Sequence, residues 1–208
     1  MKFKFKLGNQ YSRKYNLNFN FFKKWSPVMS YLLGYLFAEG NLNISKSKGH
    51  RVALQLETTD KREVSLLAEK IGSKLKTRNR QDKRHKTRTY YTVICSKEIG
   101  NDLIKLGIIP RKSSIMKFPP VPTSYLKEFV YGYLKGDGCI SYRKYKQTRY
   151  PIMSFASNSK GFLIKLNNRI TNHLKILKGR VHQNSSNKKA FQLVFSTVPT
   201  RKIMSWIR

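Results

Sequence analysis

Acidic residues are scarce in this chain. Its 208 residues include only 10 Asp and Glu against 43 Lys and Arg, so the formal net charge at pH 7 is +33. Such a charge is costly in self-repulsion once a chain is compact, and it therefore predicts a polyanionic partner. Charge alone does not separate nucleic acid, an anionic membrane and a heparin-like polymer. Because 39% of the residues are hydrophobic and 12% are aromatic, the sequence is not that of a disordered basic tail.

Cysteine and histidine are also sparse, and long apolar runs are missing. The two cysteines, Cys95 and Cys139, lie far apart without the spacing of a zinc site or a disulfide framework. The 4 histidines have no metal-ligand spacing either. The longest apolar runs, such as 31–38, are shorter than the roughly 20 residues that span a bilayer, and no stretch resembles a signal peptide. We therefore predict a soluble intracellular protein without a membrane partner, in a bacterial cytoplasm or an organelle.

An internal repeat organises the chain. The segment 34–42, which reads GYLFAEGNL, recurs at 132–140 as GYLKGDGCI. Both copies follow the pattern Gly-Tyr-Leu, any residue, small, acidic, Gly, any residue, aliphatic. The similarity continues downstream, where 58–61 corresponds to 157–160. Two copies of one structural unit are the simplest explanation.

The first copy predicts an α+β unit with the order α-β-β-α-β-β-α. Ser26 followed by Pro27 is typical of an N-cap with proline at the first helical position. We predict an apolar helix from there to Glu39, ended by Gly40 in a left-handed conformation. The patterns that follow predict strands to 45, at 51–58, at 75–81 and at 88–96, with helices at 60–74 and 97–106.

The second copy repeats this order from residue 124. We predict its later elements as a helix at 160–175 and strands at 178–183 and 190–196. The last stretch of the first copy has no counterpart there, so we expect the second copy to be shortened at its C-terminal end. A proline cluster at 119–122 marks the linker. The predicted domains are a basic leader at 1–25, a first half at 26–118 and a second half at 119–208.

Both copies place a carboxylate, Glu39 or Asp137, in the last turn of the first helix. A negative charge there opposes the helix macrodipole by about 0.3 to 1 kcal/mol. Each helix also has a face with almost no side chain, formed by small residues four positions apart: Gly34 and Ala38, Gly132 and Gly136. Packing along these faces would bring the two carboxylates together. A bound Mg²⁺, which prefers such oxygen ligands, would offset both penalties and could activate water for phosphodiester hydrolysis.

These repeated segments resemble the two signature motifs of the LAGLIDADG homing endonucleases. The first is LLGYLFAEG at 32–40, and the second is VYGYLKGDG at 130–138. The resemblance covers 27–208, because the repeat length and the element order match as well as the motifs do. It implies a monomer with an internal pseudo-twofold axis, motif helices at the interface, and two antiparallel sheets forming a saddle over the DNA major groove. It also implies that Glu39 and Asp137 hold the catalytic Mg²⁺, for which Mn²⁺ can substitute.

The same resemblance gives supporting roles to other polar residues. The family tends to place a polar residue after the second strand, matched by Asp60 and Ser159, and a lysine near the end of each unit, matched by Lys112. These residues would tune the attacking water and stabilise charge at the phosphate. Two of them have an alternative interpretation, because Asp60 could simply be the N-cap of the following helix and Lys112 could be one of many solvated cations.

Basic and polar residues alternate along predicted strands in both copies. They are Lys74, Lys76, Arg78 and Arg80 in the first copy, and Arg143, Tyr145, Gln147 and Arg149 in the second. Since successive side chains point to opposite faces of a strand, each set would share one face. We predict that these faces contact DNA phosphates and base edges. The alternative is a solvated, charged surface that protects a sheet edge from aggregation.

The resemblance therefore implies a Mg²⁺-dependent, site-specific endonuclease that binds a long asymmetric double-stranded DNA site and cuts each strand once, supporting intron or gene mobility. The first alternative is a nucleic-acid-binding relative without cleavage activity, either an RNA maturase that binds its host intron or a transcription regulator. The second alternative is a basic structural protein, such as a ribosomal one. A duplicated acid–glycine helix end would have no evident purpose in that last class.

Overall fold

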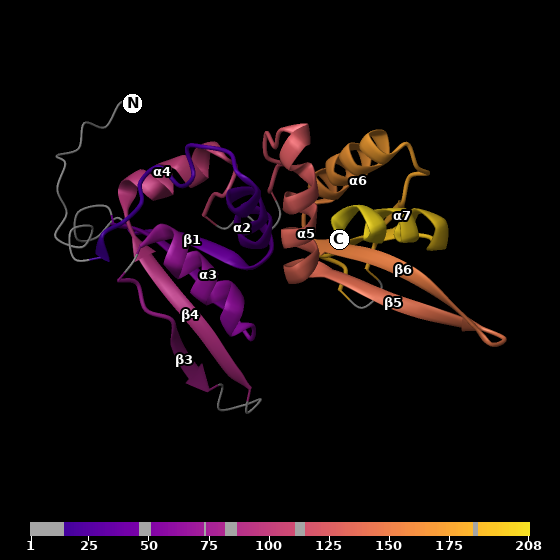
Figure 1. Ribbon diagram of the computed structural model, residues 1–208, viewed down its shortest axis with the longest axis horizontal. Helices are drawn as coiled ribbons and strands as arrows, with labels where there is room; N and C mark the ends of the chain where they lie inside the picture. The colour runs from indigo at the N-terminus through magenta and orange to yellow at the C-terminus, as the bar shows by residue number, and fades with distance from the viewer. Residues whose placement is uncertain (1–14, 46–50, 73, 82–86, 111–114, 185–186) are drawn as a thin grey trace. The chain divides into compact units, whose positions relative to one another are not determined.

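The element order is that of two successive α-β-β-α-β-β-α copies in the computed structural model, which describes residues 15–45, 51–72, 74–81, 87–110, 115–184 and 187–208 (Figure 1). The first copy consists of α2 (Pro27–Glu39), β1 (Gly40–Ser45), β2 (Arg51–Thr58), α3 (Lys61–Ile71), β3 (Arg78–Gln81), β4 (Arg88–Cys95) and α4 (Lys97–Lys105). The second consists of a 3-10 turn η2 (Thr123–Tyr125), α5 (Leu126–Asp137), β5 (Gly138–Tyr145), β6 (Thr148–Ser157), α6 (Lys160–Leu174), β7 (Arg180–Gln183), β8 (Phe191–Phe195) and α7 (Thr197–Ile207). The predicted α+β order is confirmed.

Contacts along the chain define two compact units that do not coincide with the two sequence copies. The second unit comprises Trp25–Glu39 and Ile104–Arg208, and the first unit comprises Gly40–Leu103 with the segment that precedes Trp25. Helix α2 therefore belongs to the same compact unit as the second copy, where it packs against α5 (Figure 1).

The first unit contains an antiparallel sheet in the order β1-β2-β4-β3. Val52, Leu54 and Leu56 alternate along β2 and are buried, because α3 covers that face of β2 and β4. The apolar residues that α3 buries are Val64, Leu67, Ala68 and Ile71. The intervening residues Gln55 and Glu57 lie on the opposite face, which we call the open face of the sheet.

The second unit repeats this arrangement with a sheet in the order β5-β6-β8-β7. Met153 and Phe155 of β6 pair with Phe195 and Leu193 of β8, and all four side chains are fully buried. Helix α6 packs against β6 and β8 with a face composed of Phe162, Leu163, Leu166 and Ile170. The β5–β6 hairpin extends away from α6 and α7 (Figure 1), which leaves its tip exposed.

Both boundaries of α2 were predicted correctly, but the conformation of the glycine that follows it was not. Ser26 caps the helix, since its Oγ accepts from the backbone N–H of Met29 at 3.2 Å, and Pro27 is the first helical residue. The expected left-handed Gly40 is wrong, because among the described glycines only Gly107 has a positive φ. The chain instead passes from Glu39 directly into β1.

The same transition in the second copy shows why a glycine follows the acid. Gly138 has an extended backbone with φ −107° and ψ 162°, and its N–H donates to the carbonyl of Leu134. A Cβ at this position would lie 2.4 Å from Leu134 Cδ1 and 2.6 Å from the Leu134 carbonyl oxygen. Close approach to the last helical turn, and not a left-handed conformation, therefore requires the glycine.

The described part of the leader, from Tyr15 onward, packs on the first unit. Leu17 is buried and forms a β-bridge with Gly72, the residue that ends α3. Further along, Lys23 forms an ion pair with Glu98 of α4. No helix within the described ranges is both long enough and apolar enough to cross a bilayer.

Candidate active site and nucleic-acid interface

Helices α2 and α5 contact each other backbone to backbone through their motif glycines. A Cβ added to Gly34 would lie 2.1 Å from the carbonyl oxygen of Phe129, and one added to Gly132 would lie 2.0 Å from that of Tyr31. The two contacts are equivalent under exchange of the sequence copies, since Tyr31 and Phe129 occupy the same place before each glycine. The predicted side-chain-free faces are thus confirmed, and the helix pair has local pseudo-twofold symmetry.

The two helices run parallel, so their C-terminal ends meet. Near the start of the pair, the Ser30 hydroxyl donates to the carbonyl of Tyr125 at 2.8 Å. At the other end, a Cβ on Gly136 would lie 2.4 Å from Ala38 Cβ and 3.3 Å from Glu39 Cγ. Glu39 and Asp137 are the last residues of the two helices. The structure therefore brings the two predicted metal ligands to one end of one helix pair.

Aromatic packing fixes the end of α2. The ring of Phe37 lies 5.6 Å from that of Phe129 in α5 and 5.8 Å from that of Phe162 in α6, measured between centroids. Tyr133 also contacts this cluster, with its ring tilted by 50° against that of Phe162 and 4.8 Å between the centroids. Because these rings are buried and interlocked, the backbone that carries Glu39 has little freedom to move relative to α5.

Tyr133 is the buried polar group next to Asp137. Its hydroxyl donates to the backbone carbonyl of Ala156 at 2.6 Å. Burial, and then the negative charge of Asp137, raise the pKa of Tyr133 well above its usual value. The side chain therefore remains a neutral hydrogen-bond donor at physiological pH.

A pocket of about 250 Å³ opens beside Asp137 within the second unit. Its other lining residues are Phe37, Ala38, Met116, Ala156, Ser157, Asn158 and Ala190. Asn158 is exposed and polar, and sequence reasoning missed it because the predicted polar residue was its neighbour Ser159. The repeat could have identified Asn158, because both copies place a polar residue directly after the second strand, Thr59 in the first copy and Asn158 in the second.

Both residues that follow the second strand cap the next helix, which confirms the N-cap interpretation of Asp60. Asp60 Oδ1 accepts from the backbone N–H of Arg62 at 2.9 Å. Ser159 Oγ accepts from the N–H of Phe162 at 3.3 Å and donates to the carbonyl of Met116 at 2.7 Å. The catalytic roles of these residues remain predictions. Lys112 lies outside the described residues.

The carboxylates at the helix ends are hard oxygen donors, which suit hard divalent cations. Among the residues that the structure describes, no three or more His, Cys, Asp and Glu side chains gather into a metal-binding cluster. A pair of carboxylates does not fit a closed tetrahedral zinc site. It fits Mg²⁺ or Mn²⁺, since such ions are held by one or two carboxylates and retain water and phosphate oxygens as further ligands.

The predicted cationic strand of the first copy is shorter than expected. β3 begins only at Arg78, whereas Lys74 lies in a turn and Lys76 in an irregular segment. The prediction that all four cations share one strand face is wrong, because Thr77 approaches Ser65 of α3, with 3.1 Å between the hydroxyl oxygens, and does not join the ladder. Their side chains are nonetheless exposed: Lys74, Lys76, Arg78 and Arg80.

Arg78 and Arg80 do lie on the open face of the first sheet. They pair with Tyr91 and Thr89 of β4, and directly opposed residues of an antiparallel ladder project on the same side. Tyr91 in turn pairs with Glu57 of β2. The open face is therefore lined with polar and basic side chains from three adjacent strands.

In the second copy, the predicted set is divided between two faces and a turn. Arg143 and Tyr145 share a face of β5, but the strand ends there and Gln147 lies in the two-residue hairpin turn. Arg149 pairs with Lys144, which places it on the opposite face from Arg143. The prediction of one common face is wrong for Gln147 and Arg149, because a two-residue turn pairs 145 with 148 and so reverses the alternation.

Comparisons with known proteins support the same fold. No family model and no curated protein matches the chain. Among solved structures, I-DmoI in complex with its target DNA nicked in the coding strand, in the presence of manganese, is 16% identical, with a TM-score of 0.63 over 87% of this chain and 94% of that one. The homing endonuclease I-WcaI bound to its DNA recognition sequence is 13% identical, with a TM-score of 0.59 over 90% and 85%. The N-terminal LAGLIDADG domain of DUF199/WhiA is 12% identical, with a TM-score of 0.56 over 87% and 80%.

These matches define the class of architecture. The chain has the two-copy LAGLIDADG fold, as its motifs predicted.

Proposed function

We propose that this chain is a LAGLIDADG homing endonuclease that hydrolyses DNA at a specific site with a divalent cation. The observation that carries the proposal is the end of the α2–α5 pair, where two glycine-packed parallel helices terminate in Glu39 and Asp137. Negative charges at two adjacent helix C-termini are unfavourable by themselves. A cation held between the two carboxylates would offset that cost, which explains why both helices end in an acidic residue.

The solved structures support the choice of substrate. I-DmoI and I-WcaI are structures with DNA, and the first was determined in the presence of manganese. The WhiA domain shares the fold without being named as an endonuclease. The paired acids, together with the fold, therefore support cleavage, whereas the fold by itself supports only a place in this structural class.

Each residue near the helix ends has a distinct role in the proposed reaction. Glu39 and Asp137 would hold Mg²⁺, or Mn²⁺ in its place. When bound, such a cation lowers the pKa of a water molecule and stabilises negative charge on the leaving oxygen. Tyr133, kept neutral by burial, donates to the carbonyl of Ala156 and would thereby position β6 beside Asp137. We further propose that Asp60 and Lys112 act on the attacking water and the phosphate, as the family resemblance implies.

DNA binding is proposed for the two sheets. A formal charge of +33 favours association with the phosphate backbone, and Arg and Lys side chains supply most such contacts. The proposed contacts are Lys74, Lys76, Arg78, Arg80, Arg143, Tyr145, Gln147 and Arg149. Because the two copies present different side chains, the recognised duplex would be asymmetric, and one monomer would cover it. Intron or gene mobility is the proposed biological setting.

The experiment that tests the proposal is cleavage of a randomised double-stranded DNA library by the purified protein. Parallel reactions contain Mg²⁺, Ca²⁺ or EDTA, and all ends produced are sequenced. We expect staggered ends at one long motif in Mg²⁺ alone, because Ca²⁺ supports binding geometry but activates water poorly. Ends that form equally in EDTA would contradict a metal-dependent nuclease.

The match to the WhiA domain favours one second candidate, a nucleic-acid-binding protein that does not cut. A transcription regulator would bind duplex DNA, and a maturase would bind its host intron RNA. Tight binding without any ends in Mg²⁺ would support this class.

A further inference from the structure

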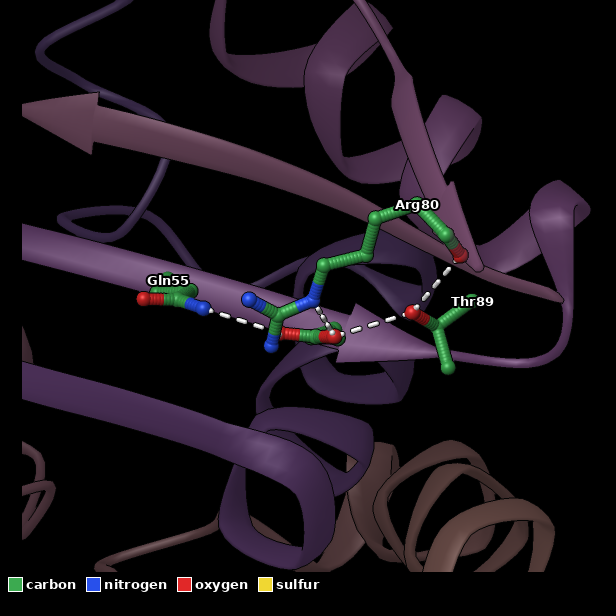
Figure 2. A network of polar contacts seen from close by, with 4 residues as sticks. Gln55, Arg80 and Thr89 are labelled. Carbon is green, nitrogen blue, oxygen red and sulfur yellow. Dashed lines mark hydrogen bonds and ion pairs between the residues drawn. The ribbon is translucent and has the colours of Figure 1, made fainter. Parts of the chain in front are cut away.

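Four side chains of the first unit form a connected polar network on the open face of its sheet (Figure 2). Glu57 is the acceptor at its centre. It receives hydrogen bonds from Arg80 Nε at 2.8 Å, Arg80 Nη2 at 2.7 Å, Thr89 Oγ1 at 2.9 Å and Gln55 Nε2 at 3.0 Å. Both carboxylate oxygens are therefore engaged, and Arg80 is bound through one whole edge of its guanidinium group.

The network has an inner and an outer part. The side chain of Glu57 is 21% exposed, whereas that of Arg80 is 65% exposed. The guanidinium carbon also lies over the ring of Tyr91, 5.9 Å from its centre, which is within the range of a cation–π contact. Glu57 is thus the more buried member of the network, and Arg80 is the member that solvent or a ligand can reach.

An acid in this place is unexpected in a chain that is proposed to bind DNA. Only 10 acidic residues are present against 43 basic ones, and a free carboxylate on the open face would repel phosphate. Its four donors show that Glu57 instead orients Arg80. A guanidinium has five N–H donors in a rigid plane. Two of these bind Glu57, so the remaining ones, on Nη1 and the outer side of Nη2, point away from the carboxylate.

We propose that Arg80, held by Glu57, reads one guanine in the major groove of the bound DNA. This inference rests on the proposed DNA-binding function. Guanine presents two acceptors, O6 and N7, to the major groove, whereas adenine has a donor in place of O6. The free end of Arg80 can donate two parallel bonds to guanine. A mobile arginine could reach a phosphate instead, which carries no sequence information. Glu57 is therefore a specificity-determining residue that acts through Arg80.

The position of the second sheet that matches Glu57 carries no acid. In the first sheet the motif glycine Gly40 pairs with Leu56, and Glu57 is the next residue. In the second sheet the motif glycine Gly138 pairs with Phe155, and the next residue is Ala156. An alanine cannot orient a cation. The guanine requirement should therefore occur on one side of the recognised sequence and have no symmetry-related counterpart.

The test is selection of bound sequences from a randomised double-stranded DNA library in Ca²⁺, so that no cleavage is needed. The proteins compared are the wild type, Glu57→Gln, Arg80→Lys and the control Glu69→Gln. Glu69 is an exposed acid of α3 that forms an ion pair with the adjacent Lys70, so this control removes the same charge away from the open face. Thermal unfolding of each variant confirms that it is folded.

We expect the wild type and Glu69→Gln to enrich one off-centre guanine over adenine by about 5- to 150-fold. Glu57→Gln and Arg80→Lys should lower that preference at least about fivefold at this position alone, while total affinity in Glu57→Gln stays equal or rises. Unchanged guanine preference in Glu57→Gln would overturn the inference, and so would a wild-type pool with no such guanine. Cleavage in Mg²⁺ is read separately, so failure of this inference is distinct from failure of the nuclease assignment.

Discussion

At the scale of single residues, Tyr133 makes the surroundings of Asp137 sensitive to pH. Burial and the charge of Asp137 raise its pKa above the unfolded value near 10. A raised folded-state pKa contributes stability that is fully present below about pH 10 and is lost as the pH rises toward the folded-state value. The native state therefore binds this proton more tightly than the unfolded state does.

The variant Tyr133→Phe tests this coupling. It leaves the Ala156 carbonyl without its donor, so we expect a loss of about 1 to 3 kcal/mol in the free energy of unfolding at pH 8. The difference from wild type should shrink above pH 10, because the wild type then loses its own contribution. Urea unfolding in EDTA at both pH values measures this. A constant difference across that range, or an equal effect of the control Tyr145→Phe at an exposed position, would contradict the account.

The positions of some candidate residues were predictable from local sequence. Glu39 and Asp137 lie at the same end of one helix pair, as expected, because the small residues four positions apart allow the two helices to pack closely. Asn158 was not found, because sequence alone does not show which of two adjacent polar residues enters a pocket and which caps a helix. The cap at Ser159 is decided by its backbone partner, which only the folded chain defines.

At the scale of elements, the α2–α5 contact depends on the absence of side chains. A methyl group at Gly132 would meet the Tyr31 carbonyl oxygen at 2.0 Å, and a backbone atom in a packed helix cannot easily move aside. We expect Gly132→Ala to destabilise the protein by about 1 to 3 kcal/mol or more and to lower DNA cleavage, because the helix ends would separate.

The matched control is Gly161→Ala in α6, where an added Cβ meets nothing within 4 Å. This change should be neutral or stabilise by up to about 1 kcal/mol, since alanine favours a helix. Urea unfolding compares the two variants. Equal stability of Gly132→Ala and Gly161→Ala would show that the helices do not pack as closely as described.

Element order was predictable from the repeat, and element boundaries were less so. The cap Ser26 and the alternation along β2 have local causes that the sequence displays. The start of β3 at Arg78 depends on a contact between Thr77 and α3, and the face of Arg149 depends on the length of a turn. Such tertiary and register effects are not encoded in the periodicity of one strand.

At the scale of the whole molecule, the sequence copies and the compact units differ. Helix α2 begins the first copy but is packed in the unit that contains the second. The sequence indicated that the small-residue faces of two helices would meet. It could not show that α2 belongs to the compact unit of the second copy, because that depends on summed packing.

The central claim is that Glu39 and Asp137 together form a metal-dependent cleavage site. The most direct measurement is cutting of the recovered DNA site, labelled on both strands, by wild type, Glu39→Gln, Asp137→Asn and the charge-matched control Glu69→Gln in Mg²⁺. We predict that each motif variant loses double-strand cleavage by about 100-fold or more, while affinity in Ca²⁺ stays within a few-fold. Double-strand cutting by either motif variant at the rate of Glu69→Gln would contradict the account.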